Sequence, residues 1–150
     1  MLCCSDILIS VYPSYAAKIL HGTKTVEFRR RPIRVQPGTR MWIYSTLPRG
    51  SIFALAIVDA VHELHPSVLW QRFSKQADIS KQDFEEYFAG TEIGFALVLG
   101  KVIPIRPEVG LEVMRGGAGA FRPPQFFKKL DPNGAELALL RSCAGLQGMT

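Results

Sequence analysis

The sequence predicts an α+β fold, in which a small, partly closed β-barrel carries flanking helices on its outside. Two observations lead to this fold class. Short apolar segments typical of β-strands occupy the first 64 residues and return near residue 94, whereas residues 65–90 show the period of helices. With 150 residues, 47% of them hydrophobic, the chain can bury an ordinary core. We therefore expect a single domain over residues 1–150.

Four strands are expected in the first part of the chain, at residues 7–13, 23–30, 41–46 and 51–64. A short helix over residues 13–22 separates the first two. Pro13 suits the first position of this helix, which needs no amide donor, and Gly22 suits the residue just after its end. The fourth strand is a long apolar run, and its length predicts a bend or a division into two pieces.

The rest of the chain is expected to add two helices, a strand and two more helices, at residues 65–77, 80–90, 94–107, 122–130 and 134–145. Ser80 is a natural N-cap for the second of these helices. The helix over residues 122–130 is inferred from the prolines that would open it. The glycines of residues 114–121 predict a flexible loop.

Charge is distributed unevenly along the chain. The net charge of +5 and the isoelectric point near 9.3 favour an acidic partner, with nucleic acid as the first candidate. Residues 1–50 contain eight Lys and Arg against two acids, residues 51–100 three against seven, and residues 101–150 seven against four. The surface that attracts anions is therefore expected to come mainly from the first third of the chain.

The three cysteines, Cys3, Cys4 and Cys143, form an odd set without C-x-x-C spacing. They predict neither a disulfide framework nor a zinc site, which favours a reducing cytosol. Residues 1–10 lack the cationic region of a secretory signal, and no apolar run is long enough to span a bilayer. We expect a cytoplasmic protein with no membrane association, no bound metal and no cofactor.

The densest cluster of charge is the segment HGTKTVEFRRRP. Side chains alternate along a strand, so Val26 and Phe28 should face the core, while Glu27 and Arg29 share the other face about 6.6 Å apart. Lys24 stands at the start of this strand. Two interpretations are open: a solvated ion pair of little energetic consequence, or a polar cluster in a cleft. In a cleft, the arginine would hold the glutamate ionised, and the lysine would meet phosphate or have its pKa lowered by burial.

This segment resembles the opening of an ASCH domain, a member of the PUA-like superfamily. The hallmark of that family is a strand–helix–strand unit ending in G-x-K-x-x-E-x-R, which stands here as Gly22, Lys24, Glu27 and Arg29. The resemblance continues in order through GTRMWIYST, GSIFALAIVDAVHEL, GFALVLGKV and FRPPQFFKKL. It covers about residues 7–130 and implies a PUA-like β-barrel; the predicted C-terminal helix over residues 134–145 lies outside it.

The resemblance implies RNA or a nucleotide as the partner, and a role in the regulation of translation or transcription. It also implies that nucleic acid binds in the cleft between the barrel and the first helix. The predicted nucleic-acid-binding residues are Lys24, Glu27, Arg29, Arg30, Arg31, Tyr12, Tyr44 and Arg122. The cations among them would contact phosphates, and the tyrosines would stack on an unpaired base. Trp42 is expected in the core instead.

A hydrolase is the alternative function, because some similar proteins act on acylated cytidine or on the RNA chain. The amidohydrolases among them pair the motif lysine with a threonine where this chain has Glu27, and their further acid should fall near Asp78. The glutamate disfavours that nucleophilic chemistry. A metal-independent ribonuclease would use Lys24 or Arg29 to stabilise a phosphorane and Glu27 or Tyr44 for proton transfer.

The sequence thus leads to three hypotheses in order. The first is an RNA- or nucleotide-binding protein that uses a basic cleft. The second is an enzyme with the same cleft, whose catalytic residues would be Lys24, Glu27 and Tyr44. The third is a protein-interaction module whose basic strand meets an acidic partner.

Overall fold

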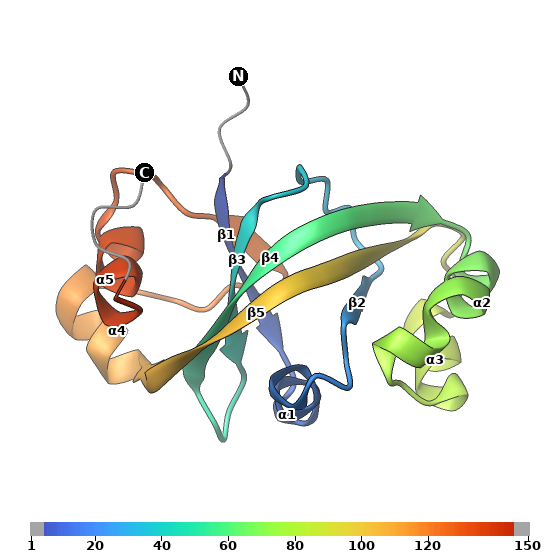
Figure 1. The fold of residues 1–150 in the computed structure, drawn as a ribbon, viewed down its shortest axis with the longest axis horizontal. Helices are drawn as coiled ribbons and strands as arrows, with labels where there is room; N and C mark the ends of the chain where they lie inside the picture. Colours follow the sequence, from blue (N-terminus) through green and yellow to red (C-terminus); the bar gives the residue numbers. More distant parts are fainter. Residues whose placement is uncertain (1–4, 146–150) are drawn as a thin grey trace.

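A six-stranded mixed sheet forms the centre of the molecule in a computed structural model that describes residues 5–145. The strands lie in the order β2-β5-β4-β3-β1-β6 and curve into a half-barrel (Figure 1). Their bounds are β1 Asp6–Val11, β2 Val26–Arg29, β3 Arg40–Ser45, β4 Ser51–Leu64, β5 Gly94–Gly110 and β6 Phe127–Lys129. The predicted α+β class and partly closed barrel are confirmed.

The pairing of the strands explains the curvature of the sheet. Strand β1 pairs in parallel with β3, whereas every other neighbouring pair in the sheet is antiparallel. The register of the long β4–β5 pair shifts at three places between Ile52 and Ala60. Such bulges bend a strand and increase its twist, so the two long strands can sweep from one end of the molecule to the other. The bend predicted for the fourth strand is therefore present.

Helices cover both ends of the sheet. Their bounds are α1 Pro13–His21, α2 Pro66–Ala77, α3 Lys81–Phe88, α4 Leu111–Ala118 and α5 Ala135–Cys143. Helices α2 and α3 lie at one end, α4 and α5 at the other, and α1 lies between these two ends (Figure 1). Helix α1 begins with Pro13 and ends at Gly22, which adopts the left-handed conformation with φ 81°. The helix ends read from the sequence at these two residues are confirmed.

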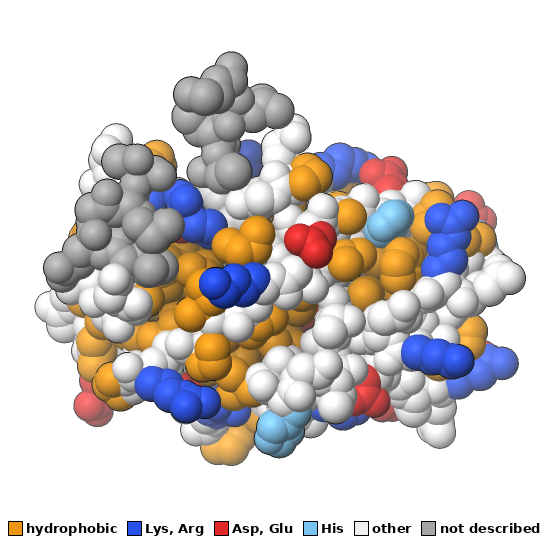
Figure 2. All heavy atoms as spheres, viewed as in Figure 1, with side chains coloured by type: hydrophobic (Ala, Val, Ile, Leu, Met, Phe, Trp, Pro, Cys, Tyr) orange, Lys and Arg blue, Asp and Glu red, His pale blue; other side chains and the backbone are white. Residues whose placement is uncertain are grey.

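The face of the molecule that Figure 2 draws carries no single basic patch. On the face shown in Figure 2, Lys and Arg side chains are scattered among hydrophobic and uncharged ones rather than gathered into one patch. Within residues 5–145, no helix is long and apolar enough to cross a membrane.

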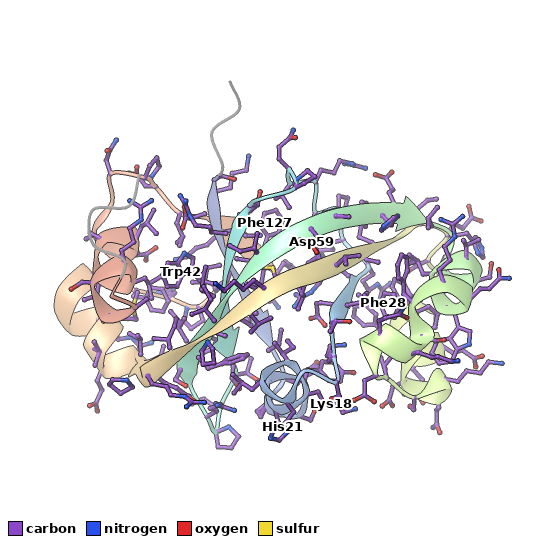
Figure 3. The ribbon with its side chains drawn as sticks, in the orientation of Figure 1. Lys18, His21, Phe28, Trp42, Asp59 and Phe127 are labelled. Carbon is purple, nitrogen blue, oxygen red and sulfur yellow. The ribbon has the colours of Figure 1, made fainter. Side chains whose placement is uncertain are left out.

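The buried hydrophobic side chains form three clusters. The first fills the half-barrel and includes Ala16 and Ile19 of α1. The second contains Trp42 and lies against α4 and α5, and the third contains Phe28 and lies against α2 and α3. Figure 3 shows Phe28 and Trp42 on these two opposite sides of the molecule. Val26 and Phe28 are 1% and 5% exposed, which confirms that they face the core.

Strand β2 is shorter than predicted, covering Val26–Arg29 instead of residues 23–30. The residue before it is held by two other elements: the Thr25 amide donates to the Gln76 carbonyl at 2.7 Å, and the Thr25 carbonyl accepts from the Leu99 amide at 2.9 Å. Thr25 is therefore hydrogen-bonded to the end of α2 and to β5 just before the chain enters β2.

Two predictions for the C-terminal third are wrong. Residues 114–121 were expected to form a flexible loop, but α4 extends to Ala118 because its Met114 is fully buried in the second cluster. A Cβ at Gly117 would lie 2.7 Å from Leu139, so this glycine allows α4 and α5 to approach closely.

The predicted helix over residues 122–130 is also absent. This segment runs extended through Pro123 and Pro124 and then forms β6, which pairs with the edge of β1. Satisfying the backbone donors and acceptors of that edge outweighs the local tendency of a proline to open a helix. The final predicted helix is present as α5, and its buried Leu137 and Leu140 make it part of the packing rather than an appendage.

Candidate functional site

A cavity of about 330 Å³ opens where the end of β1, helix α1, strand β2 and helix α3 come together. This volume lies in the range of small-molecule sites. We call this cavity the cleft. Its lining residues are Ser10, Val11, Tyr12, Tyr15, Lys24, Glu27, Phe28, Arg29, Thr46, Ile79, Tyr87, Gln125 and Phe126. Among the described residues that line the cleft, Lys24, Glu27 and Arg29 are the only ones with charged side chains.

These three residues form a continuous charged chain. Glu27 is 4% exposed and stands between two cations: its Oε1 lies 3.4 Å from Lys24 Nζ, and its Oε2 accepts a hydrogen bond of 2.6 Å from Arg29 Nη2. Glu27 and Arg29 share one face of β2, as the alternation of side chains predicted. The interpretation of this cluster as a solvated surface ion pair is therefore excluded.

Lys24 is the most deeply buried cation of the cleft, with 1% of its surface exposed. Its Nζ donates a hydrogen bond of 2.7 Å to the carbonyl of Ala77, the last residue of α2, and lies 4.6 Å from the centre of the Tyr15 ring. Burial lowers the pKa of the Lys24 ammonium, and the neighbouring Glu27 opposes this shift. The ammonium is therefore a stronger acid than that of an exposed lysine.

Arg29 connects β2 to two other parts of the chain. Its Nη2 donates to the carbonyl of Ser10 at 2.7 Å, and its Nη1 donates to the carbonyl of Phe126 at 3.5 Å. The Ser10 hydroxyl in turn donates to the carbonyl of Pro124 at 2.6 Å. The Arg29 Nε is buried without a hydrogen-bond partner among the described residues. The guanidinium thus retains an unsatisfied donor beside the cleft.

Two tyrosines that the sequence did not single out, Tyr15 and Tyr87, also line the cleft. Burial raises the pKa of both the Tyr15 and the Tyr87 hydroxyl, and Glu27 adds to the shift of Tyr15. The Tyr87 hydroxyl also accepts a hydrogen bond of 3.1 Å from the amide of Arg30, which ties α3 to the end of β2. Both tyrosines stay neutral near pH 7 and offer hydroxyl groups as donors.

A second cavity, of about 500 Å³, adjoins the cleft. We call it the arginine pocket. Its lining residues are Arg29, Arg30, Arg31, Ile33, Tyr87, Thr91, Phe126 and Phe127. Three of these, Arg29, Tyr87 and Phe126, also line the cleft. The guanidinium carbon of Arg31 lies 3.9 Å from the centre of the Phe126 ring.

The two predicted tyrosines, Tyr12 and Tyr44, lie in different parts of the molecule. Tyr12 lies at the rim of the cleft and is 66% exposed. Tyr44 does not line the cleft; it is 3% exposed and packs in the second core cluster with Trp42. Tyr44 shares the face of Trp42 on β3, and α4 and α5 cover that face. The sequence predicts a loop over residues 114–121, so the cover that α4 provides is not evident from the sequence.

The two other predicted residues also lie outside the cleft. Arg122 is exposed and lines neither cavity, and its carbonyl accepts a hydrogen bond from Lys128. Asp78 ends α2 in the left-handed conformation, and its carboxylate lies 3.7 Å from Lys18 rather than in the cleft. Within residues 5–145, no group of three or more His, Cys, Asp or Glu side chains could hold a metal ion.

Sequence reasoning missed Ser10, Tyr15, Tyr87 and Phe126. Only Tyr15 carried a local signal, because it lies on the helix of the family motif. The other three come from segments far apart in the chain, and Phe126 belongs to a segment that was predicted to be helical. Their convergence depends on the pairing of β6 with β1 and on the packing of α3 against β2.

Comparisons with known proteins agree with this architecture. The model of the ASCH domain family matches residues 9–102. An ASCH domain-containing ribonuclease of Zymomonas mobilis is 38% identical over 120 residues, which are 80% of each chain. The crystal structure of ASCH from Zymomonas mobilis superposes with a TM-score of 0.86 at 35% identity, covering 92% of this chain and 94% of that chain.

A more distant structure shares the fold alone. The N-terminal domain of Staphylothermus marinus McrB is 11% identical, covers 99% of this chain and 97% of that chain, and superposes with a TM-score of 0.56. The family model covers more than half of the chain, and the relative from Zymomonas mobilis covers four fifths of it. The half-barrel is thus a PUA-like fold, and the chain belongs to the ASCH domain family.

Proposed function

We propose that the protein is a ribonuclease that binds RNA in the cleft and cleaves it beside Lys24, Glu27 and Arg29. The observation that carries the proposal is the burial of these three charges in the wall of an open cavity. Charges are costly to bury, and such arrangements occur preferentially at functional sites. The relative with 38% identity is named a ribonuclease, which supports the same activity in this chain.

The proposed reaction is an internal transfer of the phosphodiester. The ribose 2′-hydroxyl attacks the adjacent phosphorus, and the bond from phosphorus to the 5′-oxygen breaks, leaving a 2′,3′-cyclic phosphate and a 5′-hydroxyl. Glu27 accepts the proton of the attacking hydroxyl, and Arg29 stabilises the added negative charge on the phosphorus oxygens.

Lys24 supplies the proton that the leaving 5′-oxygen needs. Burial lowers the pKa of its ammonium, which makes it a better general acid than an exposed lysine. After the step, Glu27 is protonated and Lys24 is neutral. Because Lys24 Nζ and Glu27 Oε1 lie 3.4 Å apart, the proton can return from the carboxyl to the amine and restore both groups.

A cleavage assay on single-stranded RNA tests this function. We expect the wild-type protein to cut the RNA in the presence of EDTA, and Lys24→Met to reduce the rate at least a hundredfold, in line with the loss of a general acid. Arg72→Met serves as the matched control, because Arg72 is an exposed cation on α2 that lines neither cavity. Full activity in Lys24→Met would contradict the proposal.

The products distinguish the mechanism from other routes to cleavage. A ribose without its 2′-hydroxyl should block cutting at that position, and mass spectrometry should find 2′,3′-cyclic phosphate ends. Cutting of the deoxy-substituted position would show that the 2′-hydroxyl is not the nucleophile.

RNA binding without cleavage is the second candidate function. It is favoured by the pairing of both Glu27 oxygens with cations, because these contacts already occupy the two oxygens that would have to meet the attacking hydroxyl. In that case, the wild-type protein would bind single-stranded RNA and leave it intact, and Arg29→Met would weaken the binding.

A further inference from the structure

We infer that the cleft and the arginine pocket form one track that holds two consecutive nucleotides of single-stranded RNA. This inference rests on the proposed function and specifies its substrate as an unpaired RNA strand rather than a free nucleoside or a duplex. The nucleotide in the cleft lies beside Lys24 and Glu27, and its neighbour lies in the arginine pocket beside Arg30 and Arg31.

The two cavities adjoin each other at a shared set of residues. Arg29, Tyr87 and Phe126 line both, so the two cavities meet at these three side chains. Each cavity, at about 330 and 500 Å³, lies within the size range of sites for small ligands. In the inferred track, the RNA strand crosses these three residues as it passes from the cleft to the arginine pocket.

Exposed aromatic side chains mark the course of the track. Among residues 5–145, the exposed aromatics are Tyr12, Tyr87 and Phe126, at 66%, 36% and 40% exposure. All three line the cleft, and two of them also line the arginine pocket. Exposed aromatic rings along a basic groove offer stacking surfaces to successive unpaired bases. Paired bases in a duplex present no such face, and the track therefore selects a single strand.

Charge in the arginine pocket fits a phosphate between the two bases. Among residues 5–145, those that line the pocket include three arginines and no acid. No ion pair involves Arg30 or Arg31 in the part of the chain that the structure describes. Arg31 instead lies over the ring of Phe126, which positions its guanidinium for a phosphate without neutralising its charge.

This arrangement assigns separate roles to the two cavities. Chemistry takes place at the buried charges of the cleft, whereas the arginine pocket holds the next nucleotide and orients the strand. A mononucleotide can occupy only one of them. The affinity should therefore increase sharply when the ligand grows from one nucleotide to two.

A length series measures this effect directly. Calorimetric titration uses a mononucleotide, a dinucleotide and a tetranucleotide of 2′-fluoro RNA, which cannot undergo attack by the 2′-hydroxyl. For the wild-type protein we expect at least a tenfold gain in affinity from one nucleotide to two. Arg31→Met and Phe126→Ala should each remove most of this gain, whereas the exposed control Arg72→Met should keep it.

The outcomes separate this inference from the proposed function. A gain that is unchanged in both Arg31→Met and Phe126→Ala would overturn the two-nucleotide track, while cleavage of RNA by the same proteins would leave the proposed function standing. Duplex RNA that binds as tightly as the single strand would also overturn the track. Wild-type protein that neither binds nor cuts single-stranded RNA would instead overturn the proposed function, and the track with it.

Discussion

At the scale of single residues, the burial of Lys24, Glu27 and Arg29 distinguishes the candidate site from an ordinary charged surface. Their alternation along a strand was enough to predict that Glu27 and Arg29 lie side by side, because the two-residue period of a strand is a local property. The burial of Lys24 was not predictable in the same way. It depends on Ala77 and Tyr15, which reach Lys24 only after α2 and α1 have packed on the sheet.

The lowered pKa of Lys24 leads to the first prediction. In protein labelled with ¹³C-lysine, the Cε signal of Lys24 should titrate below the ordinary lysine value of 10.5. Glu27→Gln should lower this pKa further, since it removes the group that opposes the effect of burial. A Lys24 signal that titrates at or above 10.5 would contradict the burial of its ammonium.

The same shift determines how this lysine affects stability. Between its lowered pKa and 10.5, the unfolded chain holds more protons at Lys24 than the folded chain does. The contribution of Lys24 to the free energy of unfolding therefore rises with pH across this window. The sign follows from burial, which penalises the charged form in the folded state.

Removal of the shared acid provides the second prediction. Glu27→Gln leaves Lys24 and Arg29 without their common counter-charge in a buried environment, so the free energy of unfolding should fall by about 3 kcal/mol. Urea unfolding measures this loss. Glu63→Gln is the matched control, because its ion pair with Arg34 is exposed on both sides and should contribute little. Equal effects of the two changes would show that the buried cluster is no more important than a surface pair.

At the scale of elements, α2 and α3 hold the site by packing closely on β5 and β2. Phe28 of β2 makes edge contacts with Phe84 and Phe88 of α3 at 5.0 and 5.9 Å between ring centres. Gly94 at the start of β5 permits this packing, because a Cβ there would lie 2.5 Å from Phe88 and 2.7 Å from Leu69. The wall of the cleft that carries Tyr87 thus depends on a close approach at a residue outside the site.

A pair of glycine substitutions tests this packing. Gly94→Ala should lower the free energy of unfolding by about 1–3 kcal/mol, because the added methyl group overpacks the contact with α3. Gly116→Ala should raise it by up to about 1 kcal/mol, since Gly116 lies within helix α4 and its Cβ would meet open space. Denaturant titration measures the free energy of unfolding of both variants. A change of the same sign in both would contradict the proposed difference between the two glycine contacts.

The elements show where local signals suffice. The first helix, with Pro13 at its start and Gly22 at its end, was predictable because both residues act through their own backbone. The C-terminal third was not. The burial of Met114 in the second core cluster stabilises a helix in a glycine-rich segment. Pairing with the edge of β1 stabilises residues 127–129 as a strand. Both effects are tertiary and override the local preferences of glycine and proline.

At the scale of the whole molecule, the half-barrel brings distant segments to one place. Ser10, Glu27, Tyr87 and Phe126 lie up to 116 positions apart in the chain and line the same cleft. The family fold was predictable because its motif and the order of its elements are visible in the sequence. The composition of the candidate site was not, since Tyr44 is covered by α4 and α5, while Phe126 is brought to the cleft by the pairing of the adjacent β6 with β1.

The location of bound RNA tests the central claim most directly. Amide and side-chain NMR signals of the wild-type protein should be followed during titration with a 2′-fluoro tetranucleotide. We predict that the largest changes arise from the cleft and the arginine pocket, at Lys24, Arg29, Arg31 and Phe126 among others. Changes confined to α4 and α5, at the opposite end of the sheet, would contradict the proposal that this cleft is the RNA site.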